Sequence, residues 1–502
     1  MTKDFSLRLR VIGLAAALLL PGAARAASDT VVLAEIFGPR AGWALETDDA
    51  FVLTKAGCME MLTRIDFDGT VKPGLATAWT QSAPTAWDFT IRQGVTFTDG
   101  RPLDAEAVAG ALTHVLKTPA PPRGFNPRLI SGVSVIDPKT VRITTPSPSV
   151  LVPLRVAGPS TGILSPAALQ GERPNPIRAC TGPFTAVEEV PRQALKLERN
   201  PAYWGGPANY ARAELRFIPD AQVRATMVQT GEVQIATAMP VTALRTPPAN
   251  IRVISTDLPR VTSLYLNTAK PPFDDVRVRR AIQAAIDTSA IAASVYEGLA
   301  KPAQGPFAAI EPWAPAGAAP IKADVARARA LLAEAGVKPG SLPFEILGYT
   351  ERSEMADLAA VLQAELGEIG IKATVRVAGY AALEPDVLAG KFDSMLLSRS
   401  HLTDVPDPGA FLVADYGCKG GYNLSHFCRP ALDAQLDAAT AEPEAAKRFA
   451  AYAEAAKMLQ DEAVSVFIVH EQQRDAVSTS VTGFRTHPLA HYILTRDLKA
   501  AN

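Results

Sequence analysis

One stretch of this 502-residue sequence alternates strand and helix patterns in a way that restricts the fold. Residues 344–347 have three apolar side chains out of four and fit a buried strand, and residues 371–377 alternate apolar and polar side chains as a second strand does. Between them apolar side chains recur at helical spacing, and Gly370 ends the helix. The apolar positions are Leu358, Val361, Leu362, Leu366 and Ile369. A strand, a helix and a strand in succession predict a parallel sheet covered by helices, which is an α/β fold.

The first 26 residues have the three parts of a secretory signal peptide. A basic start precedes the apolar run of residues 11–20, and Ala24-Arg25-Ala26 supplies the small residues that signal peptidase accepts. That apolar run is too short to span a bilayer as a helix, which takes about 20 residues. No cysteine lies at the cleavage site. We therefore expect a soluble periplasmic protein without a lipid anchor.

Chain length indicates the number of domains, and net charge limits the classes of partner. The chain that remains after residue 26 is longer than one hydrophobic core usually serves, so we expect at least two domains. The formal net charge of the whole chain is −1, and removing the four basic residues and one acidic residue of 1–26 leaves −4. So mild a charge argues against nucleic acid or an anionic membrane as a partner.

Four cysteines would enter an oxidising compartment, where disulfides persist. They are Cys58, Cys180, Cys418 and Cys428, and they allow three pairings. The glycine-rich stretch between the last two favours a Cys418–Cys428 disulfide, which would leave Cys58 for Cys180. A zinc site is the alternative, but no C-x-x-C motif and no nearby histidine pair supports it.

The sequence lacks the common catalytic motifs. His470-Glu471 has no second histidine to complete H-E-x-x-H, and there is neither a G-x-S-x-G elbow nor a glycine-rich phosphate loop. We therefore expect no enzymatic activity, no cofactor and no resident metal. A secreted hydrolase is the alternative from another functional class, and it would need a nucleophile next to a base.

Eight segments, in order along the chain, share the motifs of one family. They are VTFTDGRPLDAEAVAGAL (95–112), TGPF (181–184), LERNPAYWGGP (197–207), QTGEVQIA (229–236), LYLNTAKPPFDDVRVRRAIQAAID (264–287), ARARALLAEAG (326–336), LGEIGIKATV (366–375) and KMLQDEAVSVFI (457–468). This ordered set resembles the large extracellular solute-binding proteins of peptide and nickel importers, bacterial solute-binding protein family 5. Together the segments extend over nearly all of the chain after residue 26.

The resemblance implies a two-lobed periplasmic binding protein fold of the cluster C type, with a hinge between the lobes and an extra subdomain in lobe I. The implied ranges are 28–264 for lobe I with its subdomain at about 70–180, 265–472 for lobe II, and 473–502 for the return to lobe I. A monomer of this kind would close on a peptide or peptide-like solute and deliver it to the permease subunits of an ATP-binding cassette importer in the inner membrane. A sensor built on the same fold is a further alternative.

Two subgroups of the family compete for the ligand. LNTAK, DAEAVAG and NPAYWGG resemble nickel-type members, which implies a metal chelate as the solute. The loop DYGCKGGYNLSHFC (415–428) instead resembles the disulfide loop of dipeptide-type members. The sequence leaves both possibilities open.

Candidate ligand residues follow from the dipeptide-type resemblance. Asp407 matches an acidic position that receives the ammonium group of a peptide; alternatively it only caps the turn before Pro408. Dipeptide-type members also hold the substrate carboxylate with an arginine. Here Ala356 or Asp357 occupies that place, and the nearest basic residue is Arg352.

The nickel-type resemblance implies other candidates. Arg123 and Phe125 fall near an arginine and an aromatic residue that contact a chelate, with Arg128 as a second basic candidate; a solvated loop arginine is the alternative. Apart from that resemblance, Tyr416 and Tyr422 would line the cleft or pack in the core. His426 would contact a metal or, as lone histidines usually do, form an ordinary hydrogen bond.

Overall fold

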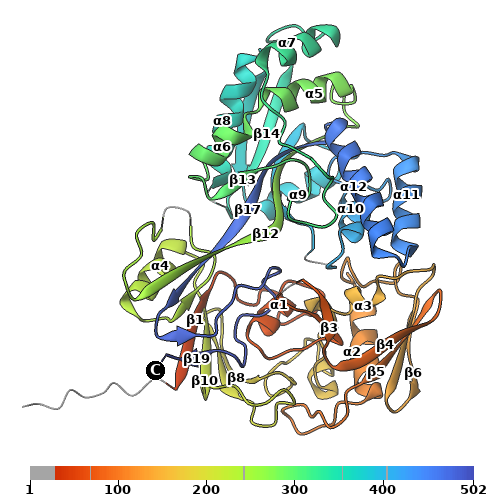
Figure 1. Ribbon diagram of the computed structural model, residues 1–502, viewed down its shortest axis with the longest axis vertical. Coiled ribbons are helices and arrows are strands. Elements are labelled where there is room, and N and C mark those ends of the chain that lie inside the picture. The colour runs from red at the N-terminus through yellow and green to blue at the C-terminus, as the bar shows by residue number, and fades with distance from the viewer. Residues whose placement is uncertain (1–28, 68, 241–242, 353, 403–404, 502) are drawn as a thin grey trace, which may run out of the picture.

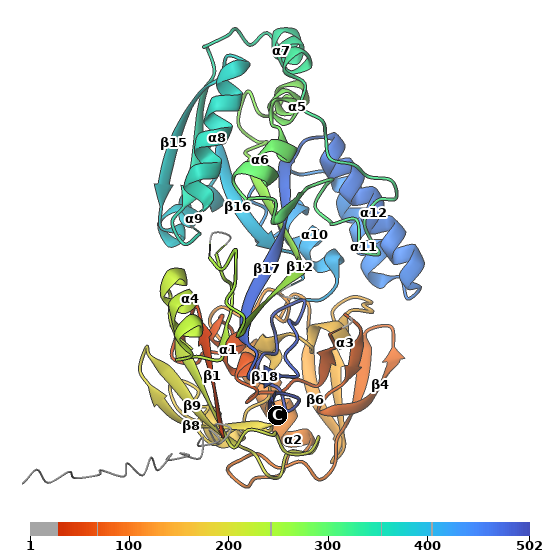
Figure 2. The same cartoon turned by 60° about the vertical axis from the view of Figure 1, so that its left-hand side comes forward.

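Two lobes stacked along the long axis make up the molecule, and two long strands join them (Figure 1). The computed structural model describes residues 29–67, 69–240, 243–352, 354–402 and 405–501, so the predicted signal peptide lies outside the described residues. The joining strands are β12 (Ile251–Leu266) and β17 (Ser465–Ser478), which pair antiparallel along their length. Figure 2 shows the same pair running from one lobe into the other.

One large sheet extends through both lobes. Its strand order is β15-β14-β16-β12-β17-β11-β1-β10-β9-β8, with β13 (Ala300–Pro302) beside β17. The other strands are β1 (Thr30–Glu35), β8 (Phe184–Val190), β9 (Ala194–Arg199), β10 (Arg212–Phe217), β11 (Ile235–Ala236), β14 (Pro343–Tyr349), β15 (Lys372–Ala378) and β16 (Ser394–Ser400). Because β12 and β17 lie in the middle of this order, the sheet places three strands in one lobe and five in the other.

Lobe I is built around a core whose buried residues run from Val31 to Phe217 and resume from Val477 to Leu498. A separate sheet of order β4-β5-β7-β6 packs beside helix α2 (Ala105–Leu116), which Asp104 caps by accepting a 2.9 Å hydrogen bond from the Ala107 amide. Its strands are β4 (Ala76–Ala83), β5 (Ala86–Ile91), β6 (Gly132–Asp137) and β7 (Thr140–Thr144). The remaining elements are α1 (Asp49–Lys55), β2 (Thr63–Ile65), β3 (Val71–Pro73), α3 (Val152–Arg155), η1 (Pro159–Thr161), η2 (Pro166–Leu169), α4 (Ala221–Thr230), β18 (Val481–Thr482) and β19 (Lys499–Ala500).

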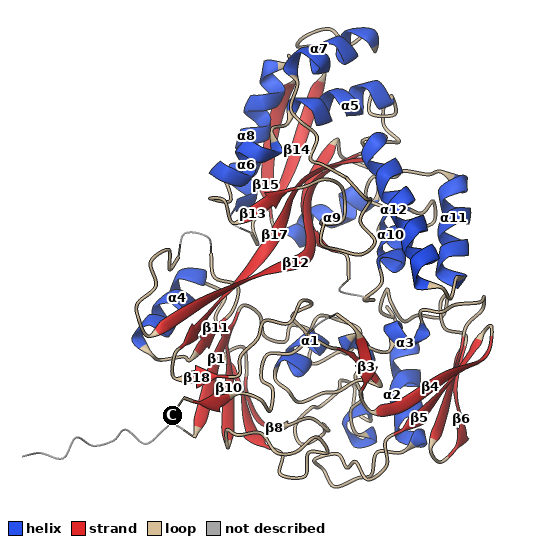
Figure 3. Cartoon of the chain, viewed as in Figure 1, coloured by secondary structure: helices blue, strands red, loops and turns tan. Residues whose placement is uncertain are grey.

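Lobe II has its own core, formed by buried residues between Val261 and Val469. Val261 and Leu264 are fully buried in it, so the chain enters lobe II a few residues before the boundary at 264 that the sequence suggested. Its helices are α5 (Val276–Ala285), α6 (Thr288–Ser294), α7 (Val325–Glu334), α8 (Glu354–Glu368), α9 (Tyr380–Leu388), α10 (Pro408–Tyr416), α11 (Pro430–Ala441) and α12 (Ala445–Asp461), as Figure 3 shows. Within the described residues, no helix is both long and apolar enough to cross a bilayer.

The predicted strand-helix-strand unit is present as β14, α8 and β15, and β14 and β15 are parallel. One detail differs from the sequence pattern. Val375 and Val377, which alternation assigned to a buried face, are 36% and 37% exposed. The reason is that β15 is the edge strand of the sheet and has only β14 as a neighbour.

Two disulfides fix chain segments within the lobes. Cys58 pairs with Cys180 inside the core of lobe I, and Cys418 pairs with Cys428 in lobe II, the pairing that the glycine-rich spacing favoured. The second disulfide closes a short loop that follows α10.

We predict that the two disulfides differ in their contribution to stability. The bonded cysteines are 122 residues apart in lobe I and 10 apart in lobe II, and the entropy of loop closure grows with the logarithm of loop length. Replacing Cys58 and Cys180 by serine should therefore lower the free energy of unfolding by about 2 kcal/mol more than replacing Cys418 and Cys428. Urea unfolding of the two double variants measures the difference, and equal losses would contradict the loop-entropy explanation.

Candidate functional site

Each lobe has a central strand flanked on both sides by parallel neighbours. In lobe I, β1 lies between β10 and β11; in lobe II, β14 lies between β15 and β16. Figure 1 shows β1 rising toward lobe II and β14 descending from the α7 end toward lobe I. Open α/β sheets bind ligands just outside the carboxyl ends of such strands, where the connections diverge to the two sides. The two lobes thus turn their expected ligand-binding edges toward each other.

The loop after β1 is organised by a buried carboxylate. Asp49, 2% exposed, accepts hydrogen bonds from the amides of Arg40, Ala41 and Trp43 at 2.7–2.9 Å. This fold of the loop leaves Phe37 42% exposed, with the Arg40 guanidinium 4.1 Å above its ring. Lobe I therefore offers an exposed aromatic ring at the carboxyl end of its central strand. Phe37 was not among the residues predicted from the sequence, because this loop is distinguished by strand order, which is not visible in one sequence.

A row of tyrosines lines the corresponding edge of lobe II. Tyr349 ends β14 and packs edge-on against Tyr380 at 5.7 Å between ring centroids, and the hydroxyl of Tyr380 contacts that of Tyr422. The Arg399 guanidinium lies 4.9 Å from the Tyr422 ring centre and forms two hydrogen bonds of 2.8 and 3.0 Å with the fully buried Asp415. The disulfide loop positions Tyr422 in this row.

Arg123 joins this row from the opposite lobe. Its guanidinium lies 4.4 Å from the ring centre of Tyr422, a cation–π contact between lobe I and lobe II. Burial raises the pKa of the Tyr422 phenol, while the two guanidinium groups act in the opposite direction, so the neutral ring is the form in contact. The lobes also meet where the Val150 amide donates to the Thr440 carbonyl at 3.3 Å. Of the basic candidates, Arg123 is the one that the structure places between the lobes.

A second polar group lies at the hinge end of this surface. Arg352, just after β14, pairs with Glu354 at 2.8 Å and with Glu471 of β17, which is 5% exposed. Burial opposes ionisation of Glu471, but Arg352 and Arg260 hold its pKa below the usual range. Arg260 of β12 donates to the carbonyl and hydroxyl oxygens of Ser398 at 3.1 and 2.9 Å. Three strands of the central sheet thus bring charged groups together beside the hinge.

Asp407, the expected receptor of an ammonium group, makes two contacts within lobe II. It is 2% exposed; Oδ1 accepts a 2.9 Å hydrogen bond from the Gly409 amide at the start of α10, and Oδ2 is 3.3 Å from Nε of Arg448. The first contact is the cap that the sequence offered as the alternative, and the second is an ion pair with a cation of α12. Across the interface, burial lowers the pKa of Arg155 in lobe I to about 10, and the Asp407 carboxylate opposes this shift.

Three other candidates are also structural. Phe125 is 1% exposed in the core of lobe I, and Tyr416 is fully buried in the core of lobe II. His426 has Nε2 3.0 Å from the carbonyl oxygen of Val387, at the end of α9, which is the ordinary hydrogen bond that the sequence left open. Among the described residues, no three histidine, cysteine or acidic side chains are grouped as metal ligands.

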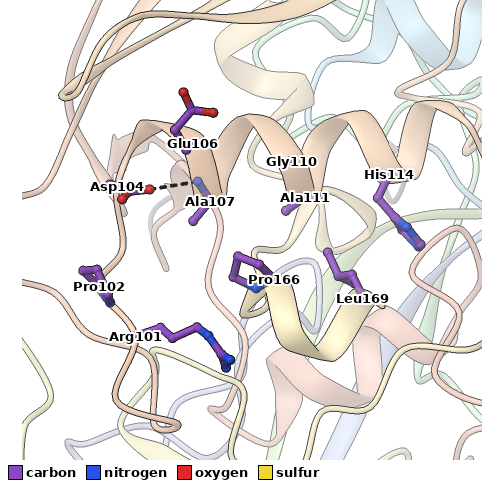
Figure 4. Close-up of a pocket in the computed structure, with 10 residues that line it drawn as sticks. All are labelled: Arg101, Pro102, Asp104, Glu106, Ala107, Gly110, Ala111, His114, Pro166 and Leu169. Carbon is purple, nitrogen blue, oxygen red and sulfur yellow. Dashed lines mark hydrogen bonds between the residues drawn. The ribbon is translucent and has the colours of Figure 1, made fainter. Parts of the chain in front are cut away.

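A separate cavity lies outside the surface between the lobes. It has a volume of about 520 Å³ and is lined by α2, η2 and the turn at Arg101, as Figure 4 shows. Arg101 points into it but is already paired with Asp99 at 2.7 Å. Because all of its lining residues belong to lobe I, relative motion of the lobes would not enclose a ligand there, and we do not assign the ligand to it.

The position of Asp407 generates a stability prediction. Asp407→Ala removes both the cap of α10 and the partner of the buried Arg448, and should cost about 3 kcal/mol in the free energy of unfolding. Asp407→Asn keeps a capping oxygen and should cost about 1 kcal/mol less. Urea unfolding compares the two. If an Asp407 variant keeps the stability of the wild type but no longer binds ligand, the structural role of Asp407 is wrong. The role expected from the sequence, binding of an ammonium group, would then hold.

Comparison of the chain with known proteins identifies its family. The profile of the bacterial extracellular solute-binding proteins, family 5 Middle, matches residues 70–423. The di/tripeptide-binding protein 2 of Pseudomonas aeruginosa is 28% identical over 464 residues, which cover 84% of this chain and 85% of that protein. A glutathione-binding protein of Salmonella paratyphi A is 27% identical over 445 residues, with coverage of 84% and 85%.

Solved structures show the same fold. NikA of Brucella suis in complex with Fe(III)-EDTA superposes with a TM-score of 0.82 and 22% identity, covering 94% of this chain and 100% of that chain. At that sequence identity the structural similarity supports the two-lobed architecture alone. The profile match extends over most of the chain, from the subdomain of lobe I to the tyrosine row of lobe II. The chain therefore belongs to the bacterial extracellular solute-binding proteins of family 5.

Proposed function

We propose that this protein is the solute-binding component of an ATP-binding cassette importer, and that it captures a peptide or peptide-like solute between its two lobes. The observation that carries this proposal is the contact of Arg123 with Tyr422, which joins the lobes beside the carboxyl end of β14. The relatives named for di/tripeptides and for glutathione support a peptide-like ligand. Binding without chemistry is the expected activity.

The proposed mechanism is closure about the two crossing strands. Pairing of β12 with β17 is interrupted between Asp257 and Val261, at the passage from one core to the other. A ligand that contacts both lobes forms all of its contacts only when the lobes are together, so binding shifts the population toward the closed form. Phe37 and Arg123 would contact the ligand from lobe I, and the tyrosine row from lobe II.

The cellular setting is part of the proposal. The signal-like segment before residue 27 supports export to the periplasm, and the absence of a cysteine at its cleavage site supports a form without a lipid anchor. We propose a monomer that presents the closed form to permease subunits in the inner membrane. The permease would then recognise ligand occupancy through the relative position of the lobes.

Calorimetry with defined solutes tests the ligand class. We expect saturable binding of an equimolar library of di- and tripeptides or of glutathione, and weaker or no binding of Fe(III)-EDTA and of nickel with histidine. Binding of the two metal chelates alone would contradict the peptide proposal and favour the chelate alternative.

The same titrations test the contact between the lobes. Arg123→Ala should weaken binding about fivefold, because a cation–π contact of about 1 kcal/mol that exists only in the closed form is lost. Arg128→Ala is the matched control: its side chain is exposed in the same loop, and the described residues give it no contact with lobe II. Equal effects of the two variants would contradict the assignment of Arg123.

A further inference from the structure

Arg260 occupies an unusual place in the hinge. It lies on β12 inside the interruption of pairing with β17, immediately before the strand enters the core of lobe II. Its register partner on β16 is Ser400, and the next pair on the same face of the sheet is Thr262 with Ser398. The side chain is half-buried, beside the loop that follows β14. Arg260 is therefore at the hinge end of the surface where the two lobes face each other.

The arginines around Arg260 all have carboxylate partners. Arg352 has Glu354 and Glu471, and Arg399 has Asp415. Arg260 donates only to the two oxygens of Ser398, and no carboxylate of the described residues is at ion-pair distance from its guanidinium.

The nearby carboxylate of Glu471 attracts Arg260 by its charge, but its two oxygens bond to other groups. One of its oxygens contacts the hydroxyl of Thr262 and the other contacts Arg352. Burial, and next the positive charge of Arg352, lower the pKa of Arg260, whereas Glu471 acts in the opposite direction. Arg260 is thus a partly desolvated cation next to a like charge, with hydrogen bonds to neutral oxygens, and a carboxylate bound to it would be favourable.

We propose that Arg260 receives a carboxylate group of the ligand. The inference rests on the function proposed above and adds the charge that the solute must carry. A guanidinium offers two parallel N–H donors to a carboxylate, and the partly desolvated setting strengthens such a pair relative to water. A terminal carboxylate of a peptide and a carboxylate of a metal chelate share this chemistry. The row of tyrosines would then hold the rest of the solute between Arg260 and Arg123.

The first test needs no ligand. Arg260→Met retains the apolar stem and removes an unpaired charge, so the midpoint of urea unfolding of the empty protein should stay the same or rise. Arg399→Met is the control, because it removes one member of a buried ion pair with Asp415, and its midpoint should fall. If Arg260→Met lowers the midpoint as far as Arg399→Met, Arg260 is a structural residue and the proposal is wrong.

The second test measures binding to a library of di- and tripeptides, to the same library with C-terminal amides, and to Fe(III)-EDTA. We expect Arg260→Met to bind the carboxylate-bearing solutes at least about tenfold more weakly, which corresponds to about 1.4 kcal/mol. The variant and the wild type should differ little on the amides. Arg260→Lys should fall between, since it keeps the charge and loses the paired donors.

The outcomes separate the two proposals. If the wild type binds peptides and Arg260→Met binds them equally well, the role of Arg260 is wrong and the proposed function stands. The same holds if the wild type binds the amides as tightly as the acids. If the wild type binds none of the three probes, the proposed function itself fails, and the inference built on it fails with it.

Discussion

The antiparallel pair of β12 and β17 is the constraint on which the rest of this structure depends. Among the described residues, these strands are the elements that carry the chain between the two cores. Hydrogen bonds keep the two strands in register at both ends, so the proposed motion of the lobes is expected where the pairing is interrupted, between Asp257 and Val261. A hinge of this kind permits rotation and resists sliding, because sliding would break both ladders at once.

Charged groups of the proposed site are carried by the same strands. Glu471 lies on β17 and Arg260 on β12, so a ligand that binds there contacts the hinge itself. Most other cations at the interface are neutralised within their own lobe, as Arg399 is by Asp415 and Arg448 by Asp407. These internal pairs fix the walls of the site, and a desolvated pair is costly to break. What remains to recognise a solute is an aromatic row with basic groups at its two ends.

The sequence predicted local structure well where the signal is local. The β14-α8-β15 unit and the Cys418–Cys428 disulfide both follow from patterns within a few tens of residues. The family followed from the order of many weak motifs along the chain, and the profile match confirms it.

Individual site residues were harder to predict, for physical reasons. Asp407 had the right chemistry for a ligand anion, but its charge is taken by Arg448, 41 residues later in the chain. Phe125 and Tyr416 are aromatic and buried, and burial depends on packing between distant elements. Phe37 and Arg260 acquire their positions from strand order and from an interruption in pairing, neither of which leaves a mark in one sequence.

The proposed function requires that a solute close the two lobes about the crossing strands. Small-angle X-ray scattering tests this closure directly, as the radius of gyration of the protein before and after saturation with a bound peptide. We expect the radius to fall on saturation, toward the value calculated from the present structure, in which the lobes are in contact. An unchanged or larger radius at full occupancy would contradict it.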